Sequence, residues 1–399
     1  MKIFKFLAVA LVAMLGFTAC EKDCDHDFIE VDHSKDLVGT WTCFQEGFAN
    51  ALVIKADGSM VSTGVLGEEY WENLNGTISV KDGKATLNYE DGVTIEGHFD
   101  IIPGMAFSIV QDNGERVTFN YCKEDLSDEI VGMWVSTDNS PVEEHNMFIQ
   151  TFYENGKSTY TGFGEMDGEI VVKKESNYKV IGDVSFQEIN GKYIAWKLSY
   201  SHNGTLLGDI MTNTNGDYTS TWLRIKQHLE LPGTKYNYMK TFVTNVKGED
   251  KDIPFLNTSF NFAKMDGSII DKFLKSILFT VEFPEANKIK YSYLLEGQNV
   301  VMEAPVQVDG NKMTIKMSAN NPAYQDVDMY AFQDQDNTQM HWYMHTTAFE
   351  KFFANTSVAL MLGYGQLDKD DTEGIANVYK TIADAVESIN LSLVMTKAK

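Results

Sequence analysis

Two stretches of this chain follow one pattern: Asp36-Leu37-Val38-Gly39-Thr40-Trp41 and Glu129-Ile130-Val131-Gly132-Met133-Trp134. In each stretch an acidic residue precedes two aliphatic residues, and Gly-x-Trp follows. The second copy lies 93 residues after the first. A repeat of this kind indicates that the chain contains copies of one structural module.

A hairpin pattern follows both copies. In the first copy it covers residues 78–87 and turns at Asp82-Gly83, and in the second it covers 184–198 and turns at Asn190-Gly191. A third hairpin of this kind covers 306–315. Asp-Gly and Asn-Gly supply the positive φ angles that two-residue hairpin turns require. We therefore expect three successive antiparallel modules, of which the third is much modified.

The boundaries of the modules follow from the spacing of the turns. Turn residues recur about every 8–12 residues with few helical runs, which is typical of a small barrel or sandwich. We place the first module at 36–126 and the second at 127–231. Pro232-Gly233 marks the start of the last segment, 232–399.

The last segment mixes strands with helices. Apolar residues at helical spacing predict helices over 269–278 and 375–389, the second one after Thr372, and a third helix is expected over 348–362. A final strand is expected over 391–395. These helices would cover a curved sheet or plug the mouth of a barrel.

The N-terminus has the pattern of an export signal. Two lysines precede an apolar run over 6–17, which is too short for the roughly 20 residues of a membrane-spanning helix. Phe17-Thr18-Ala19-Cys20 resembles a bacterial lipobox, with Phe17 where leucine is usual. We expect a signal peptide over 1–19, acylation of Cys20, and a membrane partner reached through that lipid. The alternative is a buried N-terminal helix.

An acidic spacer follows Cys20, and we assign 20–35 as a tether. An acidic stretch directly after the lipid-bearing cysteine resembles the surface-export signal of Bacteroidetes lipoproteins. The resemblance implies an outer-membrane protein at the cell surface, with the periplasmic face as the alternative.

The composition excludes several classes of protein. Asp and Glu number 57 against 33 Lys and Arg, a formal charge of −24 that would repel nucleic-acid backbones, so we expect no nucleic-acid partner. Hydrophobic residues make up 43% and aromatic residues 12% of the chain, which is enough for packed cores and excludes wholesale disorder.

Three cysteines remain after Cys20. Cys43 lies near the start of the first module and Cys122 near its end. In a closed barrel the first and last strands are neighbours, so a Cys43–Cys122 disulfide is one expectation and two buried thiols are the other. Cys24 on the spacer is then the odd cysteine.

Gly-x-Trp at the start of a run of short antiparallel strands resembles the signature of lipocalins (calycins). In that family the Trp closes the base of the barrel and an Arg from the last strand lies across its ring, a cation–π contact. The chain has two Arg, Arg116 and Arg224, near the closing strands of the modules that begin with Trp41 and Trp134. Arg116 precedes its strand, so Lys123 is an alternative, and both Arg could instead be unrelated surface charges.

The resemblance is to the lipocalin-like surface lipoproteins of Bacteroidetes. It implies a mainly β protein: two small antiparallel lipocalin-like barrels, followed by a larger β-rich α+β domain with C-terminal helices. It also implies a barrel mouth that holds a small, often apolar, ligand.

The sequence offers little chemistry. It contains no nucleophile elbow, Walker loop, His-Glu-x-x-His or Cys-x-x-Cys motif, so we expect no enzymatic activity, no cofactor and no metal. His341, Tyr343 and His345 alternate on an expected strand and share one face. They could supply two metal ligands, but polar residues lining a pocket or a surface are the simpler reading.

Three functions remain open. The first is a surface lipoprotein that binds a small ligand without catalysis, and we prefer it. The second is a glycan-binding or adhesion accessory protein that uses exposed aromatic rings. Trp71, Trp196 and Trp342 are candidates, although aromatic residues on alternating strands are more often part of the core or of a barrel lining. The third is an enzyme whose site the sequence does not reveal.

Overall fold

The computed structural model describes residues 33–398, apart from 46, 137–146, 164–169, 203–208, 217, 256–257, 266, 296, 364–366 and 369–370. The expected signal peptide, Cys20, Cys24 and most of the tether lie outside the described residues.

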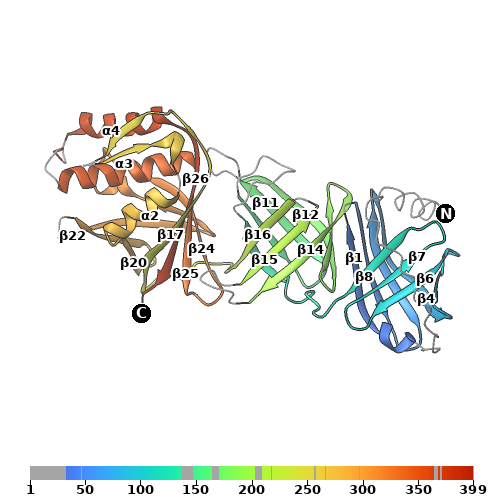
Figure 1. Ribbon diagram of the computed structural model, residues 1–399. Helices are drawn as coiled ribbons and strands as arrows, with labels where there is room; N and C mark the ends of the chain where they lie inside the picture. The colour runs from blue at the N-terminus through green and yellow to red at the C-terminus, as the bar shows by residue number, and fades with distance from the viewer. Residues whose placement is uncertain are drawn as a thin grey trace.

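The chain forms three closed antiparallel barrels of eight strands each. They follow one another in a row in the order of the sequence (Figure 1). The mainly β fold class predicted from the sequence is confirmed: two small barrels precede a larger unit that carries helices. That larger unit is itself a complete barrel.

Barrel 1 joins its strands in sequence order and closes by pairing the first strand with the last. At the closure Trp41 lies opposite Tyr121. A short 3-10 helix, η2 (His33–Leu37), precedes it. The strands are β1 (Gly39–Gln45), β2 (Phe48–Ile54), β3 (Ser59–Leu66), β4 (Glu69–Lys81), β5 (Lys84–Tyr89), β6 (Thr94–Ile102), β7 (Ala106–Val110) and β8 (Arg116–Tyr121).

Barrel 2 repeats this topology, and Arg224 lies opposite Trp134 where its last strand meets its first. With eight strands joined in sequence and a buried Gly-x-Trp at the base, both barrels are lipocalin-like. The strands are β9 (Gly132–Ser136), β10 (Met147–Phe152), β11 (Lys157–Phe163), β12 (Ile170–Ile181), β13 (Val184–Ile189), β14 (Lys192–Ser201), β15 (Ile210–Asn215) and β16 (Tyr218–Ile225).

Barrel 3 is closed by the C-terminal strand, which pairs with both β17 and β25. A two-stranded sheet of β18 (Asp252–Phe255) and β19 (Thr258–Asn261) projects beside it. The barrel strands are β17 (Thr234–Gly248), β20 (Thr280–Glu285), β21 (Lys288–Leu295), β22 (Gln298–Asp309), β23 (Lys312–Ile315), β24 (Val327–Gln333), β25 (Gln339–Met344) and β26 (Val386–Lys397).

The helices of the third unit are α2 (Gly267–Ser276), α3 (Thr346–Gly363) and α4 (Thr372–Ala385), with 3-10 turns η3 (Phe262–Lys264) and η4 (Met317–Ala319). The last predicted helix was too long, because residues 386–389 belong to β26. Their pairing with β17 outweighs the helical spacing of the apolar residues.

Helix α3 fills one end of barrel 3. Phe352 packs against Trp342 and Tyr291 of the barrel, with ring centroids 6.3 and 6.5 Å apart. A residual cavity of about 20 Å³ remains beside these rings, which is room for about one water molecule. Side chains therefore fill this part of the lumen.

Two apolar seams join the three barrels, and each is made by the outer faces of strands. Barrels 1 and 2 meet through Ala49, Ala51 and Val65 on one side and Val184, Phe186 and Ala195 on the other. Barrels 2 and 3 meet through Val135, Ile149 and Ile225 against Tyr330, Phe332 and Tyr343. Buried contacts of this kind hold the barrels in fixed positions.

Within the described part of the chain, no helix combines the length and the hydropathy needed to cross a membrane.

Candidate functional site

The base of barrel 2 is closed by Trp134, which is fully buried. Its indole Nε1 donates to the carbonyl oxygen of Ile130 at 2.7 Å. The guanidinium carbon of Arg224 lies 4.7 Å from the centre of the Trp134 ring, and the same group donates to the carbonyl of Glu129. This is the arrangement that the resemblance implied for Trp134 and Arg224.

The base of barrel 1 has the same tryptophan without the arginine. Trp41 is fully buried, and its Nε1 donates to the carbonyl of Leu37 at 2.7 Å. The ring of Tyr121 meets the Trp41 ring edge-on at 5.0 Å. Tyr121 therefore occupies the register position that Arg224 holds in barrel 2.

The expectation that Arg116 covers Trp41 is corrected by the structure. Arg116 begins β8, whereas Trp41 pairs with the last residue of that strand. Its guanidinium instead forms an ion pair with Asp100 at 3.1 Å on the surface. Lys123 is exposed and follows the end of β8.

The structure contains no Cys43–Cys122 disulfide, because both cysteines are free, buried thiols. Cys43 belongs to the interior core of barrel 1. Cys122 lies past the end of β8, where its thiol donates to the carbonyl of Glu124 at 3.0 Å. Burial raises the pKa of Cys43 to about 12 and that of Cys122 to about 11, so both thiols stay protonated at neutral pH.

His341, Tyr343 and His345 lie at the outside of barrel 3 and do not line its lumen. Tyr343 belongs to the apolar seam with barrel 2. His345 is buried with its ring 4.9 Å from that of Tyr343, and neither of its nitrogens has a hydrogen-bond partner among the described residues. Burial lowers the pKa of both histidines to about 4. The described residues contain no cluster that could hold a metal ion.

The tryptophans proposed for glycan stacking are core residues. Trp71 and Trp342 are buried, and Trp196 is half-buried against Tyr218 at 5.8 Å. None of the six tryptophans is exposed.

Polar side chains form a layer inside each of the first two barrels. In barrel 1, Trp71 donates to Ser62, which donates to Asn50, at 2.9 and 3.0 Å. In barrel 2, Nε1 of Trp196 and Oδ1 of Asn213 are buried without a partner in the described residues. Barrel 2 therefore has unused hydrogen-bonding capacity in its interior.

A groove of about 880 Å³ lies where barrel 2 meets the segment leading to barrel 3. That volume lies within the range of small-molecule sites. Its lining combines the start of β9, the end of β10 with its turn, and residues after β16: Val131, Gly132, Met133, Thr151, Phe152, Tyr153, Glu154, Asn155, Ile225, Lys226, Gln227, His228 and Glu230, with Gln335 from barrel 3.

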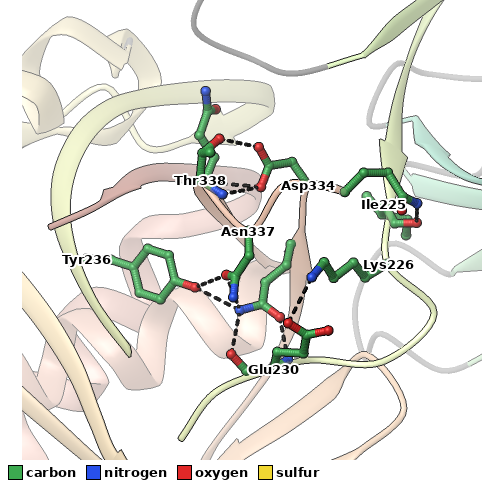
Figure 2. Close-up of polar contacts among 10 residues, drawn as sticks. Ile225, Lys226, Glu230, Tyr236, Asp334, Asn337 and Thr338 are labelled. Atoms are coloured by element: carbon green, nitrogen blue, oxygen red, sulfur yellow. Dashed lines mark hydrogen bonds and ion pairs between the residues drawn. The ribbon is translucent and has the colours of Figure 1, made fainter. Parts of the chain in front are cut away.

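The segment 226–231 forms one wall of the groove and is held by hydrogen bonds to Gln333. Figure 2 shows the polar contacts around Lys226, Glu230 and Tyr236 in this region. The Gln333 side chain is fully buried at the end of β24. Its Nε2 donates to the carbonyl of Glu230 at 3.0 Å, and its Oε1 accepts from the Glu230 amide. Gln335 donates to the carbonyl of Ile225 at 2.8 Å. Barrel 3 therefore fixes the wall of a groove that borders barrel 2.

The charges of the groove nearly cancel. Lys226 and Glu230 form an ion pair at 2.8 Å, which lowers the pKa of the Glu230 carboxyl. Glu154 supplies a further carboxylate and His228 an imidazole. The groove therefore offers an apolar surface from Val131, Met133 and Tyr153 beside a weakly negative rim.

Sequence reasoning missed this groove. Tyr153 is the residue before a turn, and Gln333 is a glutamine at the end of a strand, so neither carries a chemical motif. The one available signal was a polar residue, Gln333, at a strand end beside the second polar residue Asp334.

No family model matches the chain, and no curated protein matches it. Among solved structures, the chain is similar to a transferrin-binding protein B double mutant from Haemophilus parasuis, with 12% identity and a TM-score of 0.24. The match covers 88% of this chain and 66% of that one. Similarity at this TM-score is too weak to indicate fold or function, so the barrel assignment rests on the strand pairing.

Proposed function

We propose that this protein is a lipid-anchored, non-enzymatic binding protein of the outer membrane, and that it binds a small ligand in the groove between barrels 2 and 3. The single observation that carries the proposal is the groove itself, a hollow of about 880 Å³ with aromatic and aliphatic side chains beside polar ones.

The groove suits a small amphipathic molecule. Met133 and Tyr153 can pack on an apolar body, and burial of such a body supplies most of the binding energy. Glu154 remains as a carboxylate after Lys226 and Glu230 neutralise each other. A ligand with a neutral or positively charged polar group therefore fits better than an anion.

The interiors of the barrels are less favourable places. Trp41 and Phe107 pack in the core of barrel 1 with ring centroids 4.9 Å apart, and α3 occupies one end of barrel 3. The apolar ligand expected inside a lipocalin-like barrel would have to displace these side chains. The glycan alternative loses its main support because no tryptophan is exposed.

The location remains part of the proposal. The lipobox at 17–20 and the acidic spacer support an anchor at Cys20 on the outer membrane, with the cell surface as the preferred face. Flotation of the chain with vesicles, lost on Cys20→Ala, tests this anchor.

The binding proposal is tested by mass spectrometry of small molecules that co-purify with the chain. We compare the wild type with Tyr153→Ala, which removes an exposed ring from the groove. The expected result is a several-fold loss of the retained ligand. Phe242→Ala is the matched control, because Phe242 is a similarly exposed aromatic residue outside the groove. Equal retention by all three proteins would contradict the proposal.

A further inference from the structure

One end of barrel 1 carries an exposed apolar turn. The turn Ile102-Pro103-Gly104-Met105 joins β6 to β7, and the Met105 amide donates to the Ile102 carbonyl at 3.0 Å. Gly104 has a φ of +65°, which suits the turn position that requires positive φ. The turn leaves Ile102 59% and Met105 63% exposed.

This turn differs from the other hairpin turns of barrel 1. Those turns contain acidic or amide residues, such as Asp57-Gly58, Asp82-Gly83 and Asn113-Gly114. An exposed apolar turn at a barrel end lowers the solubility of the protein. Exposed residues of this kind therefore indicate a surface that contacts a partner or a membrane.

The apolar turn lies at the end where the chain enters barrel 1. The Tyr121 amide donates to the Met105 carbonyl at 2.7 Å, and Tyr121 lies opposite Trp41 near the start of β1. Val38, which directly precedes β1, is also exposed, at 41%. The described chain begins at His33, just before this point.

The anchor can reach this end. Twelve residues, 21–32, separate Cys20 from His33, and fully extended they span at most about 40 Å. The turn is also free of barrel 2, because β2 and β3 form the seam while β6 and β7 lie on the far side of the ring (Figure 1).

The charges at the two ends of barrel 1 also favour an orientation in which the end with Met105 faces the lipid. The turns and linker at the end with Met105 carry four basic residues, Lys55, Lys81, Lys84 and Lys123, against six acidic ones, Asp57, Asp82, Glu124, Asp125, Asp128 and Glu129. The described turns at the opposite end carry only acidic residues: Glu68, Glu90, Asp91, Asp112 and Glu115. An anionic lipid surface repels the second end more strongly than the first.

We propose that the turn 102–105, with Val38 at the same end of the barrel, contacts the lipid surface to which the chain is anchored. This inference rests on the proposed lipid anchor at Cys20. Barrel 1 then stands with its entry end on the bilayer, and the groove between barrels 2 and 3 is held away from it.

The test places a tryptophan reporter on the turn. Lipidated full-length protein carrying Met105→Trp is reconstituted in vesicles of phosphatidylethanolamine and phosphatidylglycerol, with and without brominated acyl chains. We expect bromine to reduce the added emission at least twofold. Leu278→Trp is the matched control, because Leu278 is 64% exposed on barrel 3, and its emission should not change.

The outcomes separate the turn from the anchor. A chain that floats with the vesicles but shows no quenching of Met105→Trp, or of Ile102→Trp if the first variant fails to fold, overturns the lipid contact and leaves the anchor intact. Emission that shifts to the blue without quenching, together with dimers in sedimentation, overturns it in favour of contact between two copies. A chain that never associates with vesicles contradicts both the anchor and the contact.

Discussion

At the scale of single residues, each copy of the Gly-x-Trp motif closes the base of its barrel largely through contacts within the copy. In both barrels the indole donates to the carbonyl four residues earlier, Leu37 for Trp41 and Ile130 for Trp134. The side chain that covers the indole ring comes from the last strand of the same barrel. It is Arg224 in barrel 2 and Tyr121 in barrel 1.

We predict that Arg224→Lys lowers the stability of barrel 2 by about 1–2 kcal/mol, because an ammonium cannot cover the Trp134 ring and bond to the Glu129 carbonyl as the planar guanidinium does. Urea unfolding measures the loss. Arg116→Lys is the control, since the Arg116 pair with Asp100 is exposed and should change stability little. Equal effects of the two substitutions would show that the ring contact is unimportant.

The glycines of the two Gly-x-Trp motifs differ in the space around them. Gly39 and Gly132 have φ of +137° and +135°, where a side chain is strained. A β-carbon at Gly39 would lie 2.7 Å from the Tyr121 ring, whereas at Gly132 the nearest atom is 4.0 Å away. We predict that Gly132→Ala costs about 1–2 kcal/mol and that Gly39→Ala costs more. Thermal unfolding that ranks them the other way would contradict this.

At the scale of elements, β25 carries His341 to the outside of barrel 3, and His345 directly follows the strand. His345 precedes α3, and its carbonyl accepts from the Phe349 amide at 2.8 Å. A proton on its ring would put positive charge in an apolar site at the positive end of the helix dipole. Both effects favour the neutral ring, in keeping with the absence of a partner for either nitrogen among the described residues.

We predict an acid-dependent loss of stability from this site. The pKa of His345 is lowered to about 4 in the folded chain against about 6.5 unfolded. The unfolded chain therefore binds the proton more readily, so stability falls as pH drops from about 6.5 to 4 and levels off below. The slope approaches 1.4 kcal/mol per pH unit, to order of magnitude.

Urea unfolding across this pH range measures the slope. His345→Leu should reduce the slope by about half, because His341, whose pKa is also lowered to about 4, contributes a similar slope. His98→Leu, at an exposed histidine of barrel 1, is the control. An unchanged slope in His345→Leu would mean that other groups cause the acid sensitivity.

At the scale of the whole molecule, three barrels in series are joined by two apolar seams, and polar contacts fix the position of each barrel against the next. Between barrels 1 and 2, Thr42 donates to Asp183 at 2.9 Å, and the rings of Tyr70 and Tyr193 stack at 3.7 Å. Between barrels 2 and 3, Gln333 holds the connecting segment. The groove exists because these joints are fixed.

We predict that Gln333→Met loosens the joint between barrels 2 and 3. The amide and carbonyl of Glu230 lose their partner, which costs about 1–3 kcal/mol for buried polar groups. Hydrogen exchange in residues 226–231 should accelerate, and ligand retention should fall with it. Gln307→Met, on the exposed side of β22, is the control. Unchanged exchange in Gln333→Met would show that the apolar seam alone holds the joint.

The sequence determined the architecture to a large extent. Gly-x-Trp appears twice, each time ahead of alternating strands with Asp-Gly or Asn-Gly turns, and these are local signals that depend on neighbours in the chain. They predicted two small barrels or sandwiches and a third unit with helices, and the resemblance to lipocalins favoured the barrels. The same resemblance, applied to Arg224 at the end of a closing strand, placed it against Trp134.

Only the tertiary structure decided how the barrels meet and where a ligand could bind. Tyr121 in place of Arg116, the free thiol of Cys122 and the positions of His341 and His345 outside the lumen all depend on register and on which faces of different barrels are buried. The groove is lined by residues up to about 200 positions apart, such as Gly132 and Gln335. Contacts at that separation leave no periodic pattern in the sequence, because each strand obeys only its own alternation of inner and outer faces.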